Sequence, residues 1–89
     1  MIKIRIILVY DIGEKRVSKI MKLCREYLEH IQNSVFEGDI TDSNLKELTI
    51  RLKEKIKKEE DSVIIFHLWS SNYKKEIIGL NKNEMSNII

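Results

Sequence analysis

The stretch that decides the fold is IRIILVYDI, residues 4–12. Its first seven residues are β-branched, aromatic or aliphatic apart from Arg5, which is typical of a strand, and the turn-forming residues 11–13 then end it. Because successive side chains of a strand point to opposite faces of a sheet, this strand presents apolar residues to both sides. Both sides of the predicted sheet therefore need a cover.

Two amphipathic helices are predicted beside this strand. In the first, apolar residues recur at spacings of three and four, with Lys15, Lys19 and Lys22 on the opposite side. Its apolar face consists of Val17, Ile20, Met21, Cys24, Tyr27, Leu28 and Ile31. The second helix follows the helix-capping residues 41–44 and breaks up in the charged residues 57–60. Its apolar face consists of Leu45, Leu48, Leu52 and Ile56.

Three further strands are predicted at residues 33–40, 62–69 and 76–80. The stretch 33–40 leaves no room for two separate strands, so the connection that is doubled stays open at this point. The predicted fold class is α/β of the α+β kind, a ferredoxin-like sandwich in which an antiparallel sheet carries two helices on one face.

The second face of the sheet points to a homodimer. Two helices cover only one face, whereas the strands at residues 4–10 and 62–69 are apolar on both. The 89 residues form a single domain, and a body of that size buries a limited share of its surface. We therefore expect two copies to pack through the other face, with the C-terminal segment at about 80–89 pairing with the partner subunit.

Composition limits the class of protein. Hydrophobic residues make up 43% and charged residues 34%, which is a globular balance. The apolar run before Asp11 is far shorter than the ~20 residues of a membrane span, so no membrane partner is expected. The single cysteine, Cys24, has no internal disulfide partner and falls on an apolar helix face, which favours the cytoplasm. The net charge is only +2, but the excess lies in residues 1–30, which is compatible with a nucleic-acid partner.

Asp11 is the candidate functional centre, and its role has two interpretations. It shares the side-chain parity of Ile7 and Val9, so in a dimer through that face two Asp11 carboxylates approach each other. Mg²⁺, held by one or two carboxylates and several waters, would relieve their repulsion and activate water against a phosphodiester. Alternatively, Asp11 and Glu14 form the outline of a capping box, which spacing alone favours somewhat more.

Other side chains are weaker candidates. The cations that could contact phosphates are Arg16, Lys19, Lys22 and Arg25, although a solvated helix face is the commoner role for such residues. His30 and His67 lack the cluster of Cys and His that a metal site needs, so structural roles are expected for both. Phe36 and Trp69 are expected in the core rather than stacked on bases.

Several motifs together resemble the small CRISPR-associated endoribonuclease family Cas2. They are YDI at 10–12, EKR at 14–16, IQNSVFEG at 31–38, DSVII at 61–65 and SNII at 86–89. The resemblance implies a ferredoxin-like homodimer whose last strand crosses to the partner, with Asp11 as the metal-binding and catalytic aspartate. It also places Ser34 and Phe36 in the family's SVF motif and Arg16 where a basic residue follows YDI. Met85 stands where relatives often have proline.

The resemblance implies two functions for the family. One is metal-dependent hydrolysis of single-stranded RNA or double-stranded DNA, with Mg²⁺ as the cofactor. The other is the spacer-acquisition stage, in which a non-catalytic dimer binds DNA and bridges the CRISPR integrase. A single carboxylate per chain is a small catalytic inventory, and this keeps the adaptor as the alternative to the nuclease.

Overall fold

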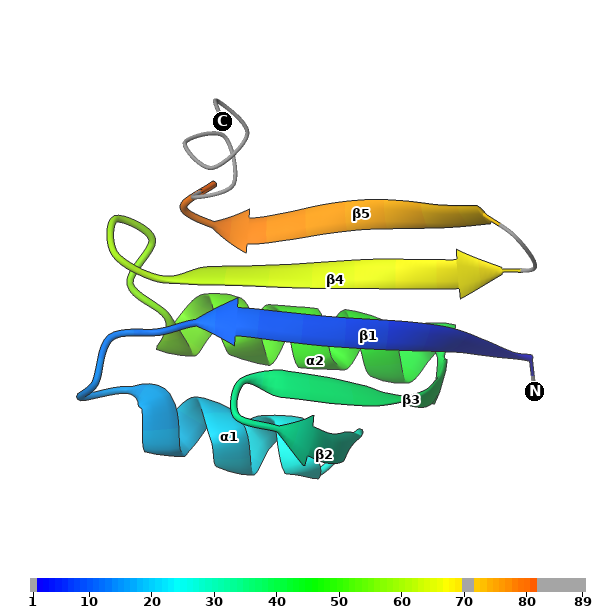
Figure 1. Ribbon diagram of the computed structural model, residues 1–89, viewed down its shortest axis with the longest axis horizontal. Coiled ribbons are helices and arrows are strands. Elements are labelled where there is room, and N and C mark those ends of the chain that lie inside the picture. Colours follow the sequence, from blue (N-terminus) through cyan, green and yellow to red (C-terminus); the bar gives the residue numbers. More distant parts are fainter. Residues whose placement is uncertain (1, 70–71, 82–89) are drawn as a thin grey trace.

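The computed structural model describes residues 2–69 and 72–81. Its elements are β1 (Lys3–Asp11), α1 (Val17–Arg25), β2 (Glu29–Gln32), β3 (Val35–Thr41), α2 (Asp42–Lys55), β4 (Ser62–Trp69) and β5 (Asn72–Gly79). The strands form one antiparallel sheet in the order β2-β3-β1-β4-β5, and both helices lie behind it in the view of Figure 1. The first four strands have the ferredoxin-like order, so the predicted α+β sandwich is confirmed.

The core lies between the helices and one face of the sheet. Ile6 and Leu8 of β1 are fully buried there, because this central strand is covered by the helices on that side. The neighbouring fully buried side chains are Ile20, Leu23, Cys24, Phe36, Leu48, Leu52, Val63 and Ile65. Burial raises the pKa of the Cys24 thiol to about 12. The predicted apolar face of the second helix and the buried thiol are thus confirmed.

The first helix is shorter than predicted, because the residues expected in its last turns form a strand of the β2–β3 hairpin. Helix α1 ends at Arg25, and Ile31, expected on its apolar face, lies in β2 and is about half exposed. Asn33 has a φ of 39°, in the left-handed region that asparagine tolerates, and it turns the chain from β2 into β3. The prediction of a helix through Ile31 is therefore wrong, whereas the strand predicted at 33–40 is present as β3 and is preceded by the unpredicted β2. Two strands occupy residues 29–41, which completes the ferredoxin-like order.

The second half of the chain follows the prediction more closely. Strand β4 has the predicted bounds, and the Thr41 hydroxyl caps α2 by accepting a hydrogen bond from the Asn44 amide at 3.2 Å. Strand β5 begins at Asn72 rather than at residue 76, because an edge strand tolerates the exposed polar side chains of residues 72–75. It pairs with its own β4 along its whole length. Of the segment at 80–89, residues 82–89 lie outside the described residues.

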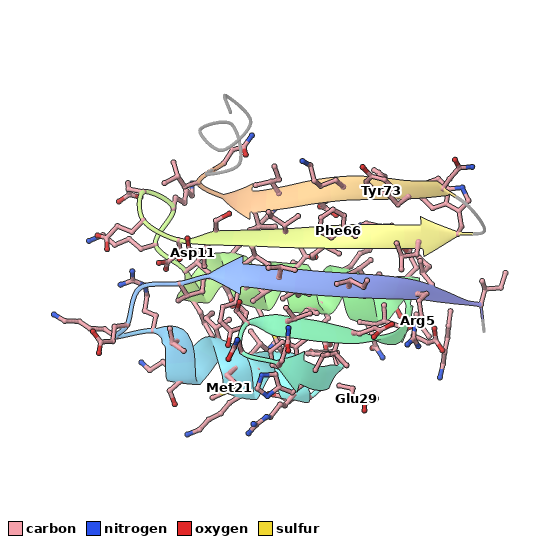
Figure 2. The ribbon with its side chains drawn as sticks, in the orientation of Figure 1. Arg5, Asp11, Met21, Glu29, Phe66 and Tyr73 are labelled. Atoms are coloured by element: carbon pink, nitrogen blue, oxygen red, sulfur yellow. The ribbon has the colours of Figure 1, made fainter. Side chains whose placement is uncertain are left out.

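The second face of the sheet carries apolar side chains that neither helix of the described residues covers. In the register of the sheet, Ile7 lies opposite Phe66, and the Phe66 ring meets the Tyr73 ring edge-on with centroids 5.8 Å apart (Figure 2). The half-buried members of this open face are Ile7, Val9, Ile64, Phe66, Leu68 and Ile77. Trp69 is half exposed, so its expected place in the core is wrong. Within the described ranges, no helix is long and apolar enough to cross a membrane.

Candidate functional site

Asp11 is exposed at the end of β1, on the open face and in line with Ile7 and Val9 (Figure 2). Its neighbour across the ladder is Ser62 of β4. Helix α1 begins only at Val17, and Arg16 at its N-cap position makes no side-chain capping bond. Neither Asp11 nor Glu14 is therefore the N-cap residue of α1, so the expected capping box does not begin this helix.

The β2–β3 turn lies beside Asp11. The Tyr10 amide donates a hydrogen bond to the Ser34 carbonyl at 3.1 Å, so the YDI and SVF motifs meet at this end of the sheet. A shallow pocket of about 400 Å³ opens there, lined by Tyr10, Asp11, Ile12, Val17, Met21, Asn33 and Ser34. Phe36 does not reach this surface. It is fully buried, as expected, and its ring stacks on His30 with centroids 4.6 Å apart.

Arg16 lies on the same loop, where a carboxylate holds its guanidinium. Its Nε donates to Asp61 Oδ2 at 2.6 Å and its Nη2 to Asp61 Oδ1 at 2.9 Å, with a weaker contact to Glu60 at 3.4 Å. Asp61 is fully buried. The hydrogen bonds from Arg16 hold the pKa of the Asp61 carboxyl far below its usual range against the opposing effect of burial, and they raise the pKa of Arg16. The phosphate role of Arg16 stays a prediction, to which the structure adds a structural role.

The other predicted cations lie in two places. Lys19 and Lys22 line a groove between α1 and α2, together with Leu23, Glu26, Arg51 and Lys55. Glu26 accepts two hydrogen bonds from Arg51, at 2.8 and 3.1 Å, so these two charges offset each other. The three lysines therefore carry the excess positive charge of the groove.

Arg25 points instead toward the β2 edge. Its Nη2 lies 3.4 Å from His30 Nδ1, while His30 Nε2 lies 2.7 Å from the Asn33 carbonyl. A carbonyl only accepts, so Nε2 carries the proton and Nδ1 is left to accept from Arg25. His67 likewise has a polar partner, Glu76, at 3.1 Å. The structural roles expected for both histidines agree with these contacts.

Asp11 is the carboxylate that lines the pocket at the end of β1. Among residues 2–69 and 72–81, no three His, Cys, Asp or Glu side chains come together as a ligand group. Mg²⁺ commonly takes one or two carboxylates and completes its shell with water, so Asp11 fits one part of such a donor set.

Sequence reasoning missed Asp61, a buried acid that accepts four hydrogen bonds. Asp61 meets Arg16 from 45 residues away. The available signal was an acid directly before a largely apolar strand, where a buried carboxylate needs a hydrogen-bonding partner. Sequence reasoning also missed Lys55 as a member of the lysine groove. The groove forms only when α1 packs against α2, and the sequence of either helix alone does not predict that packing.

Comparisons with known proteins identify the family. The family model described as CRISPR associated protein Cas2 matches residues 4–76. A protein of Dictyoglomus turgidum named CRISPR-associated endoribonuclease Cas2 is 39% identical over 85 residues, 94% of this chain and 98% of that protein. Its namesake in Pyrococcus furiosus is 42% identical over 84 residues, with the same coverage.

Solved structures agree with this assignment. A crystal structure titled as Cas2 superposes with a TM-score of 0.73 at 40% identity, covering 90% of this chain and 91% of that chain. The structure of Streptococcus pyogenes Cas2 at pH 6.5 gives a TM-score of 0.63 at 26% identity, covering 93% of both. The motifs that meet around Asp11 thus lie within a match that spans nearly the whole fold, and the chain belongs to the CRISPR-associated Cas2 family.

Proposed function

We propose that this chain forms a homodimer that hydrolyses phosphodiester bonds of RNA or duplex DNA at the spacer-acquisition stage, with Mg²⁺ at Asp11. The observation that carries the proposal is the position of Asp11 at the end of an apolar face that no helix covers. Two copies packed through that face, with the two-fold axis near the end of β1, would bring two carboxylates to one place. The relatives that are named endoribonucleases also support a phosphodiester-hydrolysing activity.

The half-buried side chains of the open face support the proposed dimer. Ile7, Ile64 and Phe66 lie on adjacent strands and form a continuous apolar surface. Apolar surface of this kind is stabilised by burial against a complementary surface, at roughly 25 cal/mol per Å². A second copy supplies a surface of the same composition, and residues 80–89 are proposed to reach the partner.

The chemistry divides between the cation and the protein. Mg²⁺ supplies charge that stabilises the phosphodiester as negative charge develops on it. Asp11 holds the cation, and the strand ladder with Ser62 fixes where the carboxylate lies. The three lysines of the helix groove are proposed to bind phosphates of the same nucleic acid, as are Arg16 and Arg25.

The Asp11→Ala variant tests the hydrolase. We expect it to lose Mg²⁺-dependent cleavage of RNA and duplex DNA by at least about 100-fold while it remains folded, because no other acid replaces the ligand. The matched control is Asp39→Ala, which removes an exposed carboxylate from β3. Cleavage by Asp11→Ala at the wild-type rate would overturn the proposal.

The alternative is a non-catalytic dimer that binds DNA and bridges the CRISPR integrase. Its supporting observation is the lysine groove combined with a single candidate carboxylate per chain. Here Asp11→Ala should leave spacer acquisition in cells intact. Loss of acquisition by Asp11→Ala, with binding to DNA and to the integrase preserved, would contradict it.

Charge reversal tests the groove itself. We expect Lys22→Glu to weaken DNA and RNA binding and to lower the dependence of affinity on salt, because fewer counterions are released. The control Lys53→Glu changes an exposed lysine of α2 that does not line this groove. Equal losses in both variants would show a general effect of net charge.

The cytoplasm is the proposed location, supported by the reduced thiol of Cys24 in the core.

A further inference from the structure

Asp61 is a fully buried acid at which three segments of the chain meet. Its Oδ1 accepts from the Gly13 amide at 2.8 Å and from Arg16 Nη2 at 2.9 Å. Its Oδ2 accepts from Arg16 Nε at 2.6 Å and from the Lys57 amide at 2.8 Å. Both oxygens are thus engaged twice, and the carboxylate joins the loop after β1 to the loop after α2.

Asp61 holds the backbone that follows Asp11 and lies next to the strand residue that pairs with Asp11. Gly13 is two residues beyond Asp11, and Ser62, which follows Asp61, is the strand partner of Asp11. A Cβ at Gly13 would lie 2.4 Å from Arg16 Nη2, so a side chain there would displace the guanidinium from Asp61. The position of the Asp11 carboxylate therefore depends on the contacts of Asp61.

The backbone of the same residue holds the end of β5. The Leu80 amide donates to the Asp61 carbonyl at 2.8 Å. Gly79 has a φ of 89°, and a Cβ there would lie 2.4 Å from the Asp61 carbonyl oxygen. Since Gly79 is also the ladder partner of Ser62, the direction in which the chain leaves β5 is set at Asp61.

We propose that Asp61 is a positioning residue that couples the placement of Asp11 to the direction in which the chain leaves the sheet toward the partner subunit. The inference rests on the proposed function, since it assigns metal binding to Asp11 and dimer contacts to the segment after Gly79. Its physical basis is that the side-chain carboxylate and the backbone carbonyl of Asp61 together accept hydrogen bonds from all three segments. A disturbance at this acid then weakens metal binding and dimer formation together.

The test uses variants that keep the fold and the charge. Arg16→Lys preserves the cation but removes the forked pair with Asp61, and Gly13→Ala displaces the guanidinium with every charge retained. Arg51→Lys is the matched control, because it removes a similar forked pair, to Glu26, between the two helices. Each protein is examined without nucleic acid, so phosphate contacts of Arg16 do not enter.

The measurements are Mn²⁺ affinity by titration calorimetry, the dimer dissociation constant by ultracentrifugation, and the melting temperature. We expect Arg16→Lys and Gly13→Ala to weaken Mn²⁺ binding by about tenfold or more, as loss of a supporting contact does at metal sites, and to weaken the dimer. Arg51→Lys should lower the melting temperature with wild-type Mn²⁺ affinity. Gly79→Ala should weaken the dimer, because its backbone conformation is strained for alanine.

Two outcomes overturn the inference. Wild-type Mn²⁺ affinity and dimer constant in both Arg16→Lys and Gly13→Ala would show that Asp61 only stabilises the fold. An equal loss of Mn²⁺ binding in Arg51→Lys would show general loosening. Asp11→Ala separates these results from a failure of the proposed function: if that variant binds Mn²⁺ as the wild type does, the metal assignment itself is wrong.

Discussion

The two faces of the sheet differ although the same strands build them. On β1, Ile6 is fully buried beneath the helices, whereas its neighbour Ile7 is only half-buried on the open face. The covered face thus completes a core within one chain, and the open face has an apolar composition without a cover. Alternate residues of this strand therefore differ in burial: one set packs in the core of a single chain, and the other belongs to the surface proposed for the dimer.

The largest expected effect comes from the two adjacent isoleucines. Ile6→Ala should lower the free energy of unfolding by about 4 kcal/mol, because it leaves a cavity in a closed core. Ile7→Ala should cost only about 1 kcal/mol in dilute protein, where the chain is monomeric. Urea unfolding followed by circular dichroism measures both values.

If two copies associate through the open face, the difference between the two isoleucine variants changes with protein concentration. The cost of Ile7→Ala should then rise with concentration, whereas that of Ile6→Ala stays constant, because only the dimer interface follows mass action. A cost for Ile7→Ala that equals that of Ile6→Ala at every concentration would mean that the two faces are equally important within one chain.

Buried charge gives the next effect. Asp61→Asn should lower the free energy of unfolding on the order of 3 kcal/mol at pH 7, because it removes the charge that pairs with Arg16 and replaces one of the two acceptor oxygens with an NH2 group that cannot accept. The pKa of Asp61 is lowered in the folded chain, so its ionised form stabilises the fold above the ordinary value of about 4. This stabilisation is lost as the pH falls below that value.

Urea titrations at pH 7 and pH 3 check the sign. The difference in unfolding free energy between wild type and Asp61→Asn should shrink at pH 3. A difference of the same size at both pH values would show that the ionised carboxylate is not what stabilises the junction.

A charge placed on the open face tests association directly. Phe66→Glu should weaken the dimer by at least about 100-fold, because it would bury an unpaired carboxylate in the interface. The control Ile50→Glu adds the same charge to an exposed site on α2. Sedimentation velocity distinguishes the two, and an unchanged dimer in Phe66→Glu would remove the open face as the interface.

The smallest effect concerns the ion pairs at the margin of the open face. Arg5 contacts Glu37 at 2.8 Å and Asp39 at 3.4 Å, but all three side chains are substantially exposed. In the monomeric Phe66→Glu background, Arg5→Ala should leave the free energy of unfolding unchanged within error at physiological salt. A clear loss of stability there would give the open face a role in folding that its exposure does not suggest.

Sequence periodicity predicted the elements whose neighbours match their pattern. β1, β4 and α2 have uninterrupted apolar or amphipathic patterns, and the structure confirms them. The same reasoning failed at residues 29–32, because Leu28 and Ile31 also fit helical spacing. The left-handed turn at Asn33 decides in favour of the hairpin, and asparagine alone is a weak signal for it.

The candidate site was predicted in part. The parity of Asp11 with Ile7 and Val9 placed it on the correct face, since alternation within a strand is geometric. The capping box was wrong because α1 starts later than its charged residues suggested. The junction at Asp61 depends on contacts between distant segments, and no local pattern encodes them.

The chemical reactivity of Cys24 can report how often the core opens. The sulfur is fully buried and its raised pKa keeps it in the unreactive thiol form. A thiol-labelling reagent therefore reaches it only when the core opens, and the chain has no second cysteine to complicate the signal. The labelling rate of the unmodified protein then measures how often the covered face comes apart, with no engineered probe.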